Sequence, residues 1–148
     1  MTQENSKQLL LKDLCARLPY GVKIELTWWV MGEGTCINTI LEPDQIEQLL
    51  NDEDGDTEIK PYLRPMSSMT EEEFTNLKEY SGLKYDQLDL ASFQNGTYKC
   101  LDFYLSEVPS AVVIKVFDWL NRYHFDYRDL IQMSLAIAVT KENNPYKE

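Results

Sequence analysis

The stretch that decides the fold covers residues 108–131 and reads V-P-S-A-V-V-I-K-V-F-D-W-L-N-R-Y-H-F-D-Y-R-D-L-I. Its apolar residues recur at helical spacing from Val112 to His124, which gives one wide stripe. Pro109 suits the first turn of a helix. The pattern therefore predicts a helix over residues 109–125 whose stripe packs into the core. His124 is then a structural residue at the end of that stripe.

Aromatic and charged residues meet where this helix is expected to end. Phe125, Tyr127 and Arg128 lie within four positions of one another there. Aromatic residues and arginine are enriched at the centres of protein interfaces. We therefore expect these three residues to form a surface contact site. Asp126 is expected to cap a second short helix, with Asp129 at its third position.

Working outward from this stretch, the sequence predicts helices and short strands in turn. Leucines at helical spacing predict a helix over residues 6–18, capped by Ser6. Strict alternation predicts a strand over residues 22–30, and a hairpin connection at residues 31–35 leads to a partner strand over 36–41. A short helix is expected at 43–50. Residues 58–65 read as extended, and Pro61 and Pro65 confine them to an edge or an irregular strand.

The clearest local signal is the start of a helix at Thr70. Thr70 and Glu73 form a capping box, and Met69 and Phe74 occupy the two positions of a hydrophobic staple. The helix is expected to run to residue 80 or 81, where Gly82 ends it. An Asn95-Gly96 turn and a strand over 97–105 should follow, with a last strand at 135–139. The ends, at about 1–5 and 141–148, are expected to be frayed.

Together these elements predict a single α+β domain over residues 1–148. Its sheet is small and mainly antiparallel, and about three helices pack on it. The strand over 22–30 also contains Trp28 and Trp29. Side chains alternate across a strand, so these two indoles point to opposite faces. One of them should belong to the core, while the other is a candidate contact residue beside Phe125–Arg128.

The composition restricts the kinds of partner. The formal net charge is −11, which disfavours direct binding to nucleic acid or to anionic lipid. It suits either solubility or a protein partner with a basic surface. The polar start has no signal-peptide pattern, and no apolar run is long enough to span a bilayer. Three widely spaced cysteines, Cys15, Cys36 and Cys100, read as free and mostly buried thiols, so we expect a cytoplasmic protein.

The most acidic part of the chain lies between residues 41 and 58. Asp52, Asp54 and Asp56 occupy the first, third and fifth positions of a calcium loop, but Thr57 stands where the sixth-position glycine belongs. Leu63 likewise replaces the final glutamate. The remaining interpretations are a solvated turn and an acidic patch that docks a basic partner. The residues of that candidate patch are Asp52, Glu53, Asp54 and Asp56.

No catalytic or cofactor-binding motif stands out. His124 is the only histidine and so the only candidate general base of its kind. No Ser-His-Asp or Cys-His order can be read around it, and Gly32-x-Gly34 lacks the lysine of a phosphate-binding loop. We therefore expect no cofactor and no metal.

Three stretches carry a resemblance to a known family. They are K-D-L-C-A-R-L-P-Y-G-V-K (12–23), I-K-P-Y-L-R-P-M-S-S-M-T-E-E-E (59–73) and D-W-L-N-R-Y-H-F-D-Y-R-D-L-I (118–131). Together they resemble a family of small uncharacterised proteins of gut Bacteroidales bacteria, their phages and mobile elements. The resemblance implies a bacterial or phage cytoplasmic setting. It implies no reaction, cofactor or catalytic residue, and it does not extend over residues 28–56.

The favoured hypothesis is a non-enzymatic interaction or regulatory protein of a phage or mobile element. A first alternative is a mimic of DNA charge that inhibits a nucleic-acid-binding host protein, and a second is a structural component of a phage particle. A small enzyme that uses His124 is the least favoured reading. The partner and the oligomeric state are left open by the sequence.

Overall fold

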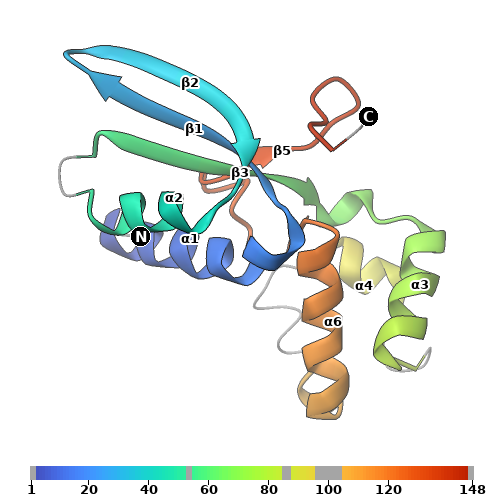
Figure 1. Cartoon of the computed structure of the whole chain (residues 1–148). Coiled ribbons are helices and arrows are strands. Elements are labelled where there is room, and N and C mark those ends of the chain that lie inside the picture. Colours follow the sequence, from blue (N-terminus) through green and yellow to red (C-terminus); the bar gives the residue numbers. More distant parts are fainter. Residues whose placement is uncertain (1–2, 53–54, 85–87, 96–104, 147–148) are drawn as a thin grey trace. The chain divides into compact units, whose positions relative to one another are not determined.

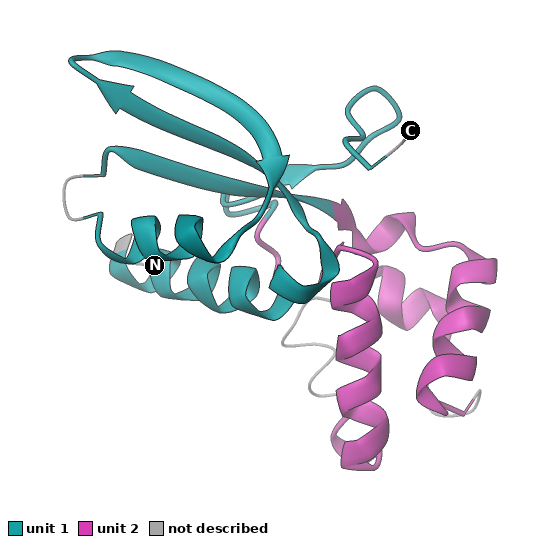
Figure 2. Cartoon of the chain, viewed as in Figure 1, with its two compact units in different colours: residues 1–63, 131–148 teal, residues 64–130 magenta. Residues whose placement is uncertain are grey.

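The computed structural model describes residues 3–52, 55–84, 88–95 and 105–146 (Figure 1). The chain forms two compact units (Figure 2). Unit 1 consists of Met1–Leu63 and Ile131–Glu148, and unit 2 consists of Arg64–Leu130. Whether the two units fold together as one domain stays a prediction.

The described strands form one five-stranded sheet with the order β2-β1-β3-β4, and β5 also pairs with β3. Strand β1 is antiparallel to both β2 and β3, whereas the short β4 and β5 run parallel to β3. The predicted α+β class with a mainly antiparallel sheet is therefore confirmed. The strands are β1 (Lys23–Val30), β2 (Glu33–Ile40), β3 (Thr57–Pro65), β4 (Phe125–Asp126) and β5 (Ile137–Ala138).

Unit 1 places two helices on one side of its strands, α1 (Gln3–Arg17) and α2 (Pro43–Leu50) (Figure 1). Alternation along β1 decides which side chains are buried: Ile24 and Leu26 are buried, and their neighbours are only half-buried. Residue Ile59 of β3 pairs with Leu26 and is buried on the same side. The predicted helix at 43–50 is confirmed at both ends.

The hairpin turn is shorter than predicted. Only Met31 and Gly32 connect β1 to β2, with positive φ values of 53° and 84°. Two-residue hairpin turns need such left-handed residues because their twist matches that of the strands. As a result β2 begins at Glu33 rather than at Cys36. Helix α1 also starts earlier than expected, at Gln3, so Ser6 does not cap it.

Of the two alternatives that its prolines predicted, an edge strand or an irregular strand, the first is wrong for β3. It lies between β1 and β4 in the strand order. Pro61 is the last β3 residue paired with β1, and the pairing with β5 begins at Tyr62. Pro65 is the last residue of the strand. Both prolines therefore stand where a ladder ends, and a missing N–H is tolerated there.

Unit 2 is built on α3 (Glu71–Ser81) and α6 (Ser110–Arg122). The capping box at the start of α3 is confirmed, since Glu73 N–H donates to Thr70 Oγ1 over 3.1 Å and Thr70 N–H donates to Glu73 Oε1 over 3.0 Å. Gly82 ends the helix in the left-handed conformation, as predicted. A short α4 (Leu90–Gln94) follows, capped by Asp89.

Helix α6 ends three residues before the predicted boundary. His124 has a φ of 64°, a left-handed conformation that turns the chain out of the helix. Phe125 and Asp126 then form β4, and Arg64 N–H donates to the His124 carbonyl over 2.7 Å. The predicted second helix capped by Asp126 is absent, because residues 126–130 are described as non-helical. Asp126 Oδ1 still accepts from Leu130 N–H over 2.9 Å.

Ordered structure extends into both of the terminal segments, about 1–5 and 141–148, that were predicted to be frayed. Helix α1 already begins at Gln3. Near the other end, the Tyr146 hydroxyl accepts from Lys23 N–H over 2.9 Å and donates to the Tyr62 carbonyl over 2.8 Å. Burial raises the pKa of Tyr146, so this hydroxyl keeps its proton.

Parts of two predicted elements lie outside the described residues. Of the predicted Asn95-Gly96 turn only Asn95 is described, and it caps the end of α4. Of the strand predicted over 97–105 only Leu105 is described. It opens a short 3-10 helix, Leu105–Glu107, instead of closing a strand. The final strand predicted over 135–139 is confirmed in a shorter form as β5.

Candidate functional site

The residues expected to form a contact site after α6 are placed inside unit 2. Phe125 and Tyr127 are 0% and 2% exposed, so the prediction of a surface position is wrong for both. Phe125 stacks on Trp119 with 5.7 Å between ring centroids, and the Tyr127 hydroxyl donates to Asn121 Oδ1 over 2.9 Å. The early end of α6 is the reason, since β4 turns these residues inward. Arg128 is half-buried and lies over the Tyr127 ring.

The exposed aromatic residue of this region is instead Tyr123. The apolar stripe assigned Tyr123 to the core, but its side chain is 41% exposed. Trp119 takes the core position and is 2% exposed. The two residues stand four apart on α6 and their ring centroids lie 4.6 Å apart. This end of α6 therefore offers an aromatic surface that is partly open to solvent.

That aromatic surface forms one wall of a cavity of about 480 Å³. Helix α3 forms the other wall. We call this cavity the acidic–aromatic pocket. Its lining residues are Glu72, Glu73, Thr75, Asn76, Glu79, Trp119 and Tyr123, all of which belong to unit 2.

Helical spacing explains why these α3 residues share a wall. Glu72, Asn76 and Glu79 stand four and three residues apart, so they lie on one face of α3. The indole N–H of Trp119 donates to Asn76 Oδ1 over 2.8 Å, which fixes the orientation of the indole against α3. Sequence reasoning missed the pocket, although the Glu72–Glu79 spacing was available as a signal. The sequence alone did not show that α3 packs against α6.

Not all three carboxylates of the pocket are equally available. Glu73 binds the guanidinium of Arg64 through two hydrogen bonds, one of them 2.8 Å from Nη2 to Oε1. Burial raises the pKa of Glu73, but the bonds from Arg64 and from the Thr70 N–H outweigh it and hold the pKa below its ordinary value. Glu72 and Glu79 are exposed. These two carboxylates therefore give the pocket its negative charge.

The two tryptophans of β1 do point to opposite faces, as predicted. Trp28 lies on the helix-facing side with Ile24 and Leu26 and is half-buried. Trp29 lies on the other side and is 39% exposed. A Cβ atom added to Gly34 would lie 2.8 Å from the Trp29 Nε1, so the indole rests directly on that glycine. Both tryptophans belong to unit 1, whereas Phe125, Tyr127 and Arg128 belong to unit 2.

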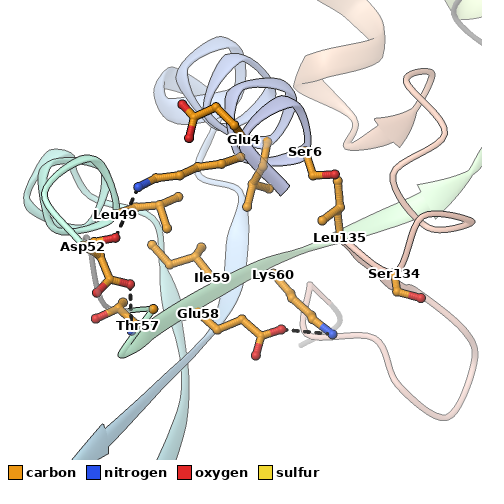
Figure 3. Close-up of a pocket in the computed structure, with 13 residues that line it drawn as sticks. Glu4, Ser6, Leu49, Asp52, Thr57, Glu58, Ile59, Lys60, Ser134 and Leu135 are labelled. Carbon is orange, nitrogen blue, oxygen red and sulfur yellow. Dashed lines mark hydrogen bonds and ion pairs between the residues drawn. The ribbon is translucent and has the colours of Figure 1, made fainter. Parts of the chain in front are cut away.

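Unit 1 also contains a polar pocket of about 860 Å³ between α1, α2 and β3 (Figure 3). Two of its lysines already have partners: Lys7 Nζ donates to the backbone carbonyl of Asp52 over 3.4 Å, and Lys60 Nζ lies 3.2 Å from Glu58 Oε1. Leu10, Leu49 and Ile59 supply apolar wall. Lysines that already have partners offer a weak site for an anionic ligand.

The candidate acidic patch is partly structural. The two carboxylate oxygens of Asp52 accept from the N–H groups of Asp56 and Thr57, each over 3.0 Å, and so hold the loop before β3. Asp56 is exposed, and Glu53 and Asp54 lie outside the described residues. Within residues 3–52, 55–84, 88–95 and 105–146, no group of three or more His, Cys, Asp or Glu side chains could hold a metal ion.

The remaining predicted residues are His124 and the cysteines. His124 is half-buried and is not among the residues lining the polar or the acidic–aromatic pocket. Cys15 and Cys36 are free thiols, and both are exposed rather than buried as predicted. Cys15 faces away from the buried side of α1 at Leu14, and Cys36 lies on β2, most of whose residues are exposed. Cys100 lies outside the described residues.

Comparisons of the chain with protein-family models, with curated proteins and with solved structures find no match. The resemblance to the Bacteroidales family therefore stays a prediction. Across the described part of the chain, no helix combines the length and the apolar character needed to cross a membrane.

Proposed function

We propose that the protein is a non-enzymatic interaction protein that binds a basic segment of a partner protein in its acidic–aromatic pocket. The observation that carries this proposal is the pairing of two exposed carboxylates, Glu72 and Glu79, with the partly exposed ring of Tyr123 in one cavity. A lysine or arginine side chain fits such a site on two counts. Its charge is attracted to the carboxylates, and its cation lies favourably against an aromatic face.

The pocket is arranged before any partner arrives. Trp119 is held by Asn76, and Glu73 is held by Arg64 and by the capping box. A wall that is already ordered loses little conformational entropy on binding. The excess of acidic residues, 25 against 14 basic ones, adds a long-range attraction for a basic surface.

The biological setting of this proposal rests on the sequence resemblance. The protein acts in the cytoplasm of a bacterial host, as a regulatory protein of a phage or mobile element. Its partner is a host or phage protein with an exposed Lys- or Arg-rich segment. Nucleic-acid-binding proteins carry such segments, so they are a natural class of partner.

A direct test follows the indole N–H of Trp119 by NMR while a tri-arginine peptide is added to the isotope-labelled protein. Binding in the pocket shifts this signal, because the indole lines the cavity. The Glu72→Gln/Glu79→Gln variant keeps the side-chain shapes and removes two charges. We expect it to bind the peptide about fivefold to thirtyfold more weakly, which corresponds to about 1–2 kcal/mol for two exposed ion pairs.

The matched control is Glu71→Gln/Glu107→Gln, which removes the same charge at two exposed positions outside the pocket. The control should bind like the wild type. Equal weakening in both variants would mean that only the overall charge matters, and the pocket would lose its role. That outcome would favour the DNA-charge mimic, in which many spread carboxylates act together. A Trp119 signal that does not move at millimolar peptide would overturn the proposal.

A further inference from the structure

Strand β2 is an exposed edge of the sheet. It stands at the end of the strand order, and seven of its eight residues are exposed. It lacks the proline, lysine and arginine residues that often protect an edge strand, and its single charge is Glu33 at one end. Two of its apolar side chains, Ile37 and Ile40, are 43% and 49% exposed. Such an edge is a template for pairing with another strand.

The hydrogen-bond pattern of the hairpin defines which backbone groups of β2 face outward. Leu41 N–H donates to the Val22 carbonyl over 2.9 Å, so the odd-numbered residues of β2 bond to the even-numbered residues of β1. Trp29 N–H donates to the Asp56 carbonyl on the other side of β1, which agrees with this alternation. The N–H and C=O groups of the even-numbered β2 residues therefore point away from β1. These residues are Gly34, Cys36, Asn38 and Ile40.

We propose that two copies of the protein form a symmetric dimer by antiparallel pairing of their β2 strands, with Ile37 opposite Ile37 of the second copy. The inference is independent of the acidic–aromatic pocket. A two-fold axis makes the contact self-complementary. In this register Gly34 pairs with Ile40 of the second copy and Cys36 pairs with its Asn38, so every outward-facing residue finds a partner. Each of these pairs exchanges two backbone hydrogen bonds.

The same register also pairs the exposed apolar side chains. Ile37 meets Ile37 of the second copy at a position without hydrogen bonds, where opposed side chains stand closest. Ile40 of the second copy comes beside Gly34, and the indole of Trp29 that covers this glycine lies next to it. Shifting the axis to Cys36 or to Asn38 leaves one outward-facing residue of each copy without a partner. The register centred on Ile37 is therefore the most favourable.

The charges on the β2 edge itself do not oppose a second copy, although each chain carries a net charge of −11. The dimer register places Glu33 opposite Leu41 of the second copy, which is apolar. The two Glu33 residues are then roughly 27 Å apart along the strands, well beyond the screening length at physiological salt. A basic partner strand would find little charge to bind along this neutral edge.

The test measures the mass of the full-length protein by analytical ultracentrifugation over a range of concentrations. We expect a monomer–dimer equilibrium for the wild type. Cys36→Pro removes an outward-facing N–H without touching the β1 ladder, and a dimer loses two hydrogen bonds with it. We expect the dimer dissociation constant to rise about thirtyfold, whereas Cys36→Ser, which keeps the N–H, leaves it within about twofold.

Cross-linking tests the register itself. In a Cys15→Ser/Cys36→Ser/Cys100→Ser background, Ile37→Cys should form an intermolecular disulfide under copper–phenanthroline oxidation, because opposed residues on paired strands come within disulfide range. Thr35→Cys alone should not, since the two copies of residue 35 stand four positions apart. A protein that is monomeric at every concentration, a dimer unaffected by Cys36→Pro, or a cross-link at residue 35 but not at residue 37 would overturn the proposal.

Discussion

The candidate contact surfaces of units 1 and 2 offer different groups to a partner. Unit 1 buries an ion pair, Asp13–Arg17 on α1, in which both side chains are 0% exposed, and it exposes the nearly neutral strand β2. Unit 2 buries an aromatic cluster and exposes carboxylates around its acidic–aromatic pocket. We therefore expect the two proposed contacts, at β2 and at the acidic–aromatic pocket, to depend on different interactions. A strand edge binds through backbone hydrogen bonds and apolar side chains, whereas a charged pocket binds through attraction that salt weakens.

The largest expected effect comes from breaking the buried ion pair of unit 1. Arg17 Nε donates to Asp13 Oδ2 over 2.8 Å, one helical turn away. Arg17→Met leaves a carboxylate buried without its guanidinium, so we expect the free energy of unfolding to fall by about 3–5 kcal/mol. Chemical denaturation measures this loss.

The double variant Asp13→Leu/Arg17→Met serves as the control, because apolar side chains of similar volume remove both charges at once. It should recover most of the stability that the single variant loses. If the single and the double variants were equally destabilised, packing of the arginine stem rather than its charge would be what unit 1 needs at this position.

The next largest effect concerns the aromatic wall of the acidic–aromatic pocket. Trp119→Phe removes the bond to Asn76 and part of the buried indole surface. We expect the free energy of unfolding to fall by about 1–3 kcal/mol and tri-arginine binding to weaken, with the β2 dimer unchanged. Denaturation, peptide titration and ultracentrifugation of this one variant compare the two contacts directly. A changed dimer would show that they are coupled.

Local signals in the sequence predicted local structure well. The capping box at Thr70 and the proline at the start of α2 act within one helical turn, so these boundaries could be read without tertiary information. The end of α6 could not, because it depends on the left-handed turn at His124 and on the pairing of β4 with β3. The prediction that Phe125 and Tyr127 lie at the surface failed for the same reason.

The acidic–aromatic pocket could not be predicted from the sequence, for a different reason. Glu72 and Glu79 lie on the helix that starts at Thr70, and Tyr123 belongs to the apolar stripe of a different helix. Only the pairing of α3 with α6 brings the two sets together. The exposed edge of β2 depends likewise on strand order, which the hairpin alone does not determine.

The pH dependence of stability distinguishes Glu73, whose carboxylate is bound within the fold, from Glu72 and Glu79, whose carboxylates are exposed in the pocket. The pKa of Glu73 is lowered in the folded protein, so its contribution to stability is complete above its unfolded pKa of about 4.3. The contribution is lost as the pH falls through the folded pKa. We expect Glu73→Gln to flatten the acid side of the stability profile, measured by denaturation between pH 3 and 7.

The Glu72→Gln/Glu79→Gln variant is the comparison for this titration. These two side chains are exposed, so their removal should leave the acid side of the profile nearly as steep as in the wild type. If this variant and Glu73→Gln flattened the stability profile equally, Glu72 and Glu79 would stabilise the fold as Glu73 does. They would then not be reserved for a partner.

The smallest expected change in stability is also the most specific for the strand edge. Gly34 has no positive φ, so alanine fits its backbone, but the added Cβ would meet the Trp29 indole at 2.8 Å. The indole is the exposed far end of a side chain and can move aside, so the free energy of unfolding should change by less than about 1 kcal/mol. The displaced indole no longer lies beside Ile40 of the second copy, and the dimer should weaken about tenfold.

Ultracentrifugation measures this weakening, and Thr39→Ala, on the opposite face of β2, is the matched control. A dimer that tolerates Gly34→Ala as well as Thr39→Ala would show that the backbone hydrogen bonds alone hold the edge, since the side-chain match at Trp29 would then contribute nothing.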